Sequence, residues 1–209
     1  MNLLGYIGRY WLLILIVLGV SASYFNNSNK SVTSDIVVSD VDLKQALNIT
    51  VDTIYLVESA IEKNLDESEV KDDLALWVLV GALEDAYNSA IPKLDENHIG
   101  IQPNVDASLL AFRDINLNGE LDKKDNEEII FLIEIDGANS RVIATSRTGA
   151  IDEYRISGTG ILTGYLVGSM LSRQKIAGVT SSQLAKKKPV SAKAAARARA
   201  GSGSYSRGK

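Results

Sequence analysis

The chain has 209 residues, contains no cysteine and carries 22 basic against 26 acidic side chains. Its length allows one domain with a hydrophobic core. The lack of cysteine excludes disulfides, thiolate metal sites and cysteine nucleophiles. The single histidine, His98, excludes a metal centre built from several histidines. Because no nucleophile motif accompanies His98, we expect a loop histidine and a protein that is not an enzyme.

Residues 1–23 predict a signal peptide or a membrane anchor. Arg9 is the only charge before an apolar run from Tyr10 to Val20. A short basic region followed by about a dozen apolar residues is typical of a secretory signal. An uncleaved anchor would use residues 3–20, near the lower length limit for a membrane span. Both alternatives place the following residues outside the cytosol, so we expect localisation to the membrane or cell envelope. Residues 24–38 predict a polar linker.

Residues 39–157 predict an α+β body that begins with a helical hairpin. Between residues 41 and 65, apolar side chains recur at steps of three and four, which is typical of an amphipathic helix. Ser39 or Asp40 is the expected N-cap. Residues 66–90 predict a second helix whose centre is apolar on every side and therefore buried. The short connection predicts that the two helices pack antiparallel.

The second half of the body predicts a small antiparallel sheet of three or four strands. Segments rich in apolar and β-branched residues, separated by turn residues, occupy positions 107–112, 128–136, 141–146 and 150–157. Residues 93–104, which include His98, predict a loop. Because helices precede strands instead of alternating with them, the order favours an α+β fold.

One loop of the body contains metal-ligating residue types at regular spacing. Residues 114–125 match the pattern D-x-N-x-N-G-x-x-D-x-x-D. Oxygen-bearing residues at alternate positions, followed by a glycine, can surround a calcium ion, which takes about six to eight oxygen ligands. A simple Asn-Gly hairpin turn is the alternative, but it does not require the acidic residues at these offsets. The expected ligands are Asp114, Asn116, Asn118, the backbone carbonyl of Glu120, Asp122 and Asp125.

This loop resembles the EF-hand calcium loop. It is at least as similar to calcium loops that join two β-strands in secreted bacterial surface modules. The resemblance covers residues 114–125 only, so it implies a calcium site and not a family function. The loop departs from the EF-hand pattern at Asp125, where EF-hands carry a glutamate, and in its flanks, which predict strands. Another divalent ion is the alternative occupant.

Residues 158–178 predict a glycine-rich helix. Gly160, Gly164 and Gly168 recur every four residues, which would place them on one helix face for close packing against a membrane or protein partner. The uncharged stretch 156–172 is at the short limit for a membrane span. If this stretch spans a membrane, the residues that follow it return to the cytosol. Otherwise, the helix packs on the body or on a partner.

Residues 179–209 predict a flexible basic tail. Residues 154–209 contain 11 basic residues and no acidic one, whereas the first 153 residues carry a net charge of −15. This asymmetry predicts that the tail contacts an anionic lipid, polymer or nucleic acid. The residues expected to make the contact are Lys186, Lys187, Lys188, Lys193, Arg197 and Arg199.

Three functions fit these patterns. The first is an exported or membrane-anchored, non-enzymatic interaction module with a structural calcium site and a basic tail for an anionic partner. The second is a two-span accessory subunit of a membrane complex with a cytosolic tail. The third, a minor alternative, is a hydrolase that uses carboxylates, although no pair of acidic residues has a spacing typical of acid–base catalysis.

Overall fold

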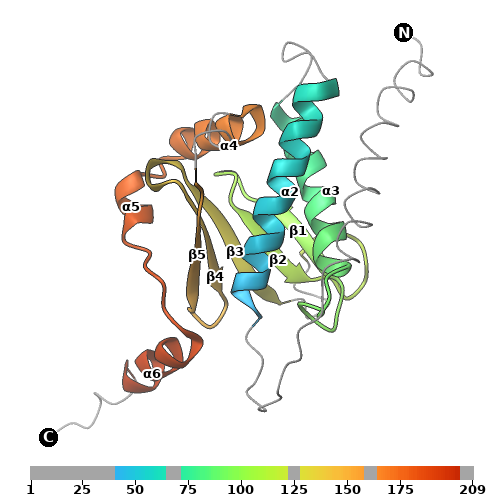
Figure 1. The fold of residues 1–209 in the computed structure, drawn as a ribbon. Coiled ribbons are helices and arrows are strands. Elements are labelled where there is room, and N and C mark those ends of the chain that lie inside the picture. Colours follow the sequence, from blue (N-terminus) through green and yellow to red (C-terminus); the bar gives the residue numbers. More distant parts are fainter. Residues whose placement is uncertain (1–40, 65–71, 122–127, 158–163, 203–209) are drawn as a thin grey trace, which may run out of the picture.

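The computed structural model describes residues 41–64, 72–121, 128–157 and 164–202 (Figure 1). The expected signal or anchor, the linker and both candidate caps before residue 41 lie outside this part of the chain. Within the described residues, no helix combines the length and apolar composition that a membrane crossing requires. The elements are α2 (Leu43–Asn64), α3 (Asp72–Asn88), β1 (Ile99–Pro103), β2 (Leu109–Arg113), β3 (Ile129–Asp136), the short 3₁₀ turn η2 (Gly137–Asn139), β4 (Arg141–Ser146), β5 (Ile151–Arg155), α4 (Tyr165–Ile176), α5 (Ser181–Ala185) and α6 (Ala192–Ser202).

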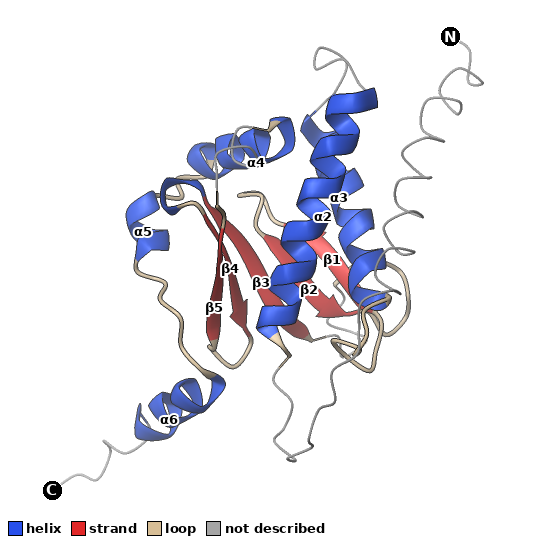
Figure 2. Ribbon diagram, in the orientation of Figure 1, coloured by secondary structure: helices blue, strands red, loops and turns tan. Residues whose placement is uncertain are grey.

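The α+β class is confirmed, with a five-stranded antiparallel sheet in the order β1-β2-β3-β4-β5 (Figure 2). Strands β2 to β5 occupy the four predicted segments, but β1 falls within the segment predicted to be a loop. Gly100 and Pro103 of β1 are residue types that are uncommon within a strand. Gly100 lies opposite Phe112 in the sheet, and a Cβ at this position would overlap the Phe112 ring. Glycine is therefore compatible with a strand here because the neighbouring side chain fills the space that its own would occupy.

Helices α2 and α3 form the predicted hairpin and cover one face of the sheet, with α2 over β4 and β5 and α3 over β1 (Figure 1). The carboxylate of Asp42 accepts a hydrogen bond from the Gln45 N–H at 3.1 Å, so Asp42 caps the start of α2. Most of the apolar centre of α3 is buried, as predicted. Trp77 is the exception, because 61% of its surface is exposed.

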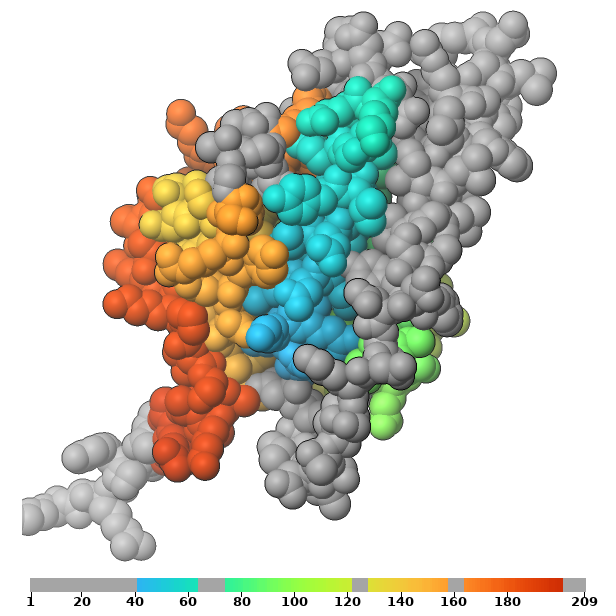
Figure 3. Space-filling model, in the orientation of Figure 1, coloured from blue at the N-terminus to red at the C-terminus, as the bar shows by residue number. Residues whose placement is uncertain are grey.

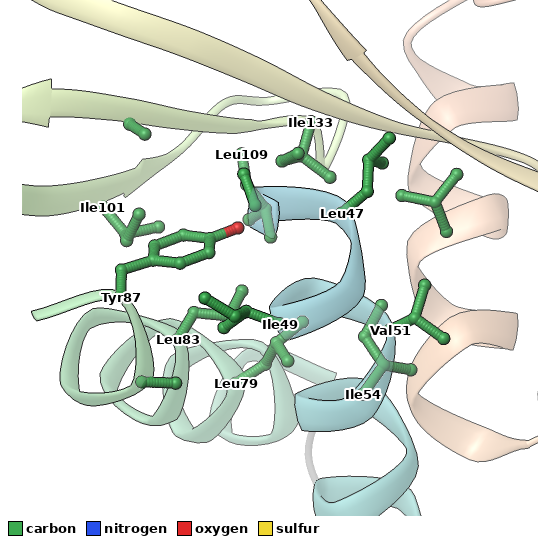
Figure 4. Packing of buried hydrophobic residues seen from close by; sticks show 14 of the residues in the cluster. Leu47, Ile49, Val51, Ile54, Leu79, Leu83, Tyr87, Ile101, Leu109 and Ile133 are labelled. Carbon is green, nitrogen blue, oxygen red and sulfur yellow. The ribbon is translucent and has the colours of Figure 1, made fainter. Parts of the chain in front are cut away.

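The main core lies between the hairpin and the sheet (Figure 4). Tyr87 of α3 packs edge-on against Phe131 of β3, with ring centroids 5.4 Å apart. Its hydroxyl shares a hydrogen bond of 2.6 Å with the hydroxyl of Thr50 in α2. The Tyr87 ring therefore joins the sheet to both helices, while its polar end is satisfied inside the core.

The core does not end at residue 157, where the sequence places the end of the body. Leu166, Val167 and Met170 of α4 belong to the same cluster of buried apolar residues as the hairpin and the sheet. α4 begins at Tyr165 with Gly164 as its N-cap, so Gly164 precedes the helix instead of lying on its face. Of the three glycines predicted to share a face, only Gly168 lies within α4, and Gly160 lies outside the described residues.

The tail was expected to be flexible, but its described part contains α5 and α6 and returns to the sheet. Leu184 and Ala195 are buried. Val190 forms a two-residue bridge with Ile151 of β5, through hydrogen bonds of 2.8 and 2.9 Å in the two directions. The composition of the tail favoured a solvated segment. The apolar residues that attach it, Leu184, Val190 and Ala195, are separated by basic residues and form no periodic apolar pattern. Residues 203–209 lie outside the described part.

Candidate metal loop and basic arm

The candidate metal loop follows β2 directly and lies at the end of the sheet where β1 begins. The Asp114 N–H donates to the His98 carbonyl at 2.9 Å, which ties the first loop residue to the residue before β1. Asp114 is only 2% exposed. The predicted loop histidine is therefore a neighbour of the first predicted ligand.

Three of the predicted ligands fold back onto the backbone of their own loop. Asp114 accepts hydrogen bonds from the N–H groups of Asn118 at 3.1 Å and Gly119 at 2.9 Å. Asn116 accepts from Asn118 at 3.0 Å, and Asn118 accepts from Glu120 at 2.8 Å. The side-chain oxygens at positions 114, 116 and 118 thus all turn towards one short stretch of backbone.

Two residues of this loop adopt left-handed backbone conformations, Leu117 with φ of 60° and Gly119 with φ of 73°. Glycine accepts this conformation without steric cost, whereas leucine does not. The tight curl of the loop explains the glycine of the motif. The strained Leu117 was not predicted, because nothing in its residue type indicates a left-handed conformation.

The structure places four of the six predicted ligands in this curl, and Asp122 and Asp125 lie outside the described residues. Within the described part of the chain, no group of three or more Asp, Glu or His side chains is arranged to hold a metal. The side-chain oxygens from Asp114, Asn116 and Asn118 include one carboxylate and two amides. Such a set suits a hard cation once further carboxylates join it.

Acidic side chains of α3 lie near this loop. Burial is the main cause that raises the pKa of Glu84. His98 lowers this pKa, whereas the negative charges of Asp114 and Asp85 raise it further. The His98 Nε2 lies 4.0 Å from a Glu84 oxygen. Glu84 was not predicted to lie near the loop, because helical periodicity does not indicate contact with a segment 30 residues later in the chain.

A row of alternating charges crosses the base of the loop. Arg113 pairs with Asp95 at 3.0 Å and with Glu128 at 2.9 Å, and Arg147 pairs with the same Glu128 oxygen at 2.7 Å. Burial would raise the pKa of Asp95, but hydrogen bonds from Asn97 and Arg113 outweigh it and lower this pKa. Because Arg113 and Glu128 stand on either side of the loop, their pairing holds its two ends together.

We use the name basic arm for residues 181–202, which comprise α5, α6 and their connection. Five of the six basic residues expected to contact an anionic partner are exposed: Lys186, Lys188, Lys193, Arg197 and Arg199. The contact itself stays a prediction. Lys187 instead pairs with Glu134 of β3, so its charge is compensated within the fold. Arg199 donates to the Arg147 carbonyl at 2.8 Å, which holds α6 at the turn between β4 and β5. Figure 3 shows the arm along the flank of the molecule.

Arg141 holds the first half of the arm to the sheet. Its guanidinium pairs with Asp136 at 2.9 Å and with Glu153, and it donates to the carbonyls of Leu184 at 2.8 Å and Lys187 at 2.9 Å. The hydrogen bond from Arg141 is the main cause that lowers the pKa of Glu153. A buried arginine with this many partners fixes the position of α5.

Comparisons with protein-family models, with curated proteins and with solved structures found no match to this chain.

Proposed function

We propose that the protein is an exported or membrane-anchored, non-enzymatic interaction module, in which residues 114–125 hold a structural calcium ion and the basic arm contacts an anionic partner. The proposal rests chiefly on Asp114. Its carboxylate is almost fully buried, lies near the acidic Glu84, and forms no ion pair with a basic side chain of the described residues. The backbone N–H groups of Asn118 and Gly119 donate to this carboxylate, but a buried charge is usually also paired with an opposite charge or a metal ion. A calcium ion held by the oxygens of the loop would supply it.

The attachment of the arm to the sheet supports a single location for body and arm. Arg141 and the Ile151–Val190 bridge join the two, so we place the arm on the same side of any membrane as the body. The burial of Leu166 and Val167 in the core favours this arrangement over a second membrane span. With the N-terminal segment as a signal or anchor, both parts would lie outside the cytosol. The proposed partner is then an anionic lipid surface or an acidic extracytoplasmic polymer.

Calorimetric titration of the full-length chain with calcium tests the metal site. We expect saturable binding with a dissociation constant of about 10⁻⁴–10⁻³ M, the range of extracellular calcium modules. Asp114→Asn and Asn116→Ala should each weaken it. Asp106→Asn is the matched control, because Asp106 also accepts a backbone N–H within a turn, from Ser108, but lies outside the motif. No binding to the wild-type chain, or equal loss in the Asp106 variant, would contradict the calcium site.

A further inference from the structure

A hollow of about 320 Å³ lies between β5 and the basic arm. Arg141, Glu153 and Arg155 from the sheet line one side, and Lys188 lines the other. A water molecule occupies about 30 Å³ of the liquid, so the hollow has room for a group larger than a single inorganic anion. The hollow could not be predicted from sequence, because its walls come from segments more than 30 residues apart.

The charge inside the hollow is positive. Arg141 donates four hydrogen bonds, to Asp136, Glu153 and two carbonyls of the arm. Glu153 accepts from Arg141 and also from the Arg155 Nε at 2.9 Å, so two guanidinium groups already compensate its single negative charge. The charge of Lys188 has no carboxylate partner among the described residues. The walls contain three cations and one anion, and with Asp136, which pairs with Arg141 behind them, the net charge is still positive.

The unused donors point to an oxyanion. The Arg155 side chain is 78% exposed, and among the described residues only its Nε takes part in a hydrogen bond, to Glu153. The terminal nitrogens of Arg155 and the ammonium of Lys188 remain available for a ligand. Arginine presents a fork of donors and lysine a mobile point charge, and together they suit a group with several charged oxygens. A phosphate offers more oxygens than a carboxylate to bridge two such donors.

The position of Lys188 is fixed by the residues on both sides of it. The carbonyl of the preceding Lys187 accepts from Arg141 at 2.9 Å. Two residues later, Val190 is bridged to Ile151 of β5. The backbone that bears Lys188 is thus fastened to the sheet twice within four residues. A site whose frame exists before the ligand arrives loses less entropy on binding than a flexible tail does.

We propose that this hollow binds a phosphate-bearing group, from a lipid headgroup or from a phosphodiester polymer, through Arg155 and Lys188. The inference rests on the anionic partner assigned above to the basic arm, and it identifies one place where that partner is held. The rest of the arm would add general electrostatic attraction, whereas the hollow would add a saturable site.

Titration of the full-length chain with glycerol phosphate, followed by NMR or calorimetry, tests the hollow. We expect saturable binding that weakens at least about tenfold in the double variant R155Q/K188Q, because it loses the charge-assisted bonds. The matched control is K186Q/K193Q, which removes two exposed charges from the arm outside the hollow. It should change the affinity by less than about twofold. Equal losses in both variants, or no binding to the wild-type chain, would overturn the site.

Vesicles that contain phosphatidylglycerol, and soluble poly(glycerol phosphate), separate this inference from the function on which it rests. Both double variants should lower binding to these larger partners, and R155Q/K188Q should lower it more. For each partner, the loss of binding in R155Q/K188Q is compared with the loss in K186Q/K193Q. The partner that shows the larger difference is the source of the phosphate. Binding that falls equally in both variants would remove the hollow but keep the anionic partner. Binding of neither partner by the wild-type chain would overturn the anionic partner and the hollow together.

Discussion

The carboxylate of Glu58, in α2, accepts hydrogen bonds from the Leu166 N–H at 3.0 and 3.2 Å and so caps the first turn of α4. The two residues are 108 positions apart, and the Glu58 side chain is 4% exposed. The first N–H groups of a helix lack partners within it, and a carboxylate satisfies them and interacts favourably with the helix dipole. Gly164 makes this contact possible, because a Cβ there would overlap the carboxylate.

The first prediction is that Gly164→Ala destabilises the fold. Displacing the Glu58 carboxylate would leave a buried charge without its N–H donors, at a cost of about 1–3 kcal/mol. Gly168→Ala is the matched control, because no atom lies within 4 Å of the added Cβ and alanine favours a helix interior by about 0.5–1 kcal/mol. Urea unfolding of both variants measures the difference. A Gly164→Ala protein as stable as Gly168→Ala would show that the carboxylate contact is unimportant.

The second prediction concerns pH. Burial is the main cause that raises the pKa of Glu58 above its ordinary value of 4.5, and hydrogen bonds from Leu166 and Val167 oppose it. The folded state therefore binds this proton more tightly than the unfolded state. Its stabilising contribution is fully present below pH 4.5 and is lost as the pH rises through the folded pKa.

Glu58→Gln cannot titrate, so the difference in unfolding free energy between wild type and variant isolates this effect. We expect the wild-type protein to lose stability relative to Glu58→Gln as the pH rises from about 4 to 7. Urea unfolding at several pH values provides the measurement. A constant difference across this range, or one of opposite slope, would contradict the raised pKa.

The third prediction is that Arg141→Met releases the basic arm. The substitution leaves Asp136, which is 0% exposed, without its cation, and loss of one partner of a buried ion pair costs about 3–5 kcal/mol. Hydrogen exchange of residues 181–190 should accelerate more than that of α2. Arg147→Gln serves for comparison, because Arg147 is more than half exposed in its pair with Glu128 and should cost at most about 1 kcal/mol. Unchanged exchange in the arm would refute this role of Arg141.

The fourth prediction concerns truncation. A chain that ends at residue 157 lacks Leu166, Val167 and Met170, each of which contributes about 1.5–3 kcal/mol through burial. We expect it to lose cooperative thermal unfolding and to bind an apolar dye. A chain that ends at residue 202 retains all of α6 and should unfold like the full-length protein. Cooperative unfolding of the shorter chain at the same temperature would show that α4 is dispensable.

The hairpin and strands β2 to β5 were predictable because each depends on a local pattern. The apolar steps of residues 41–65 and the β-branched run of residues 128–136 indicate secondary structure without knowledge of the rest of the fold. Strand β1 depends instead on pairing with β2. A helix was predicted within residues 158–178, and α4 lies there, but its attachment to the core depends on Glu58 from a distant helix. Propensity is a weak guide where tertiary contacts decide the conformation.

The same distinction applies to the candidate site. The D-x-N-x-N-G spacing was visible because the predicted ligands lie within one stretch of twelve residues, and the curl of the loop follows from it. Glu84 and the Asp95–Arg113–Glu128 row were not visible, because the fold brings them together from separate elements. The hollow beside Lys188 was hidden by a composition that suggested a flexible tail.

Both outer strands of the sheet have backbone groups already occupied. At β1, the Asn88 side chain accepts from the Ile99 N–H and donates to the Ile99 carbonyl, both at 2.8 Å, and Pro103 has no N–H to offer. At β5, Val190 occupies both backbone groups of Ile151. An unprotected edge strand is a template on which further chains can polymerise. The asparagine and the basic arm therefore each cover part of one sheet edge and reduce the backbone that is open to strand pairing between copies.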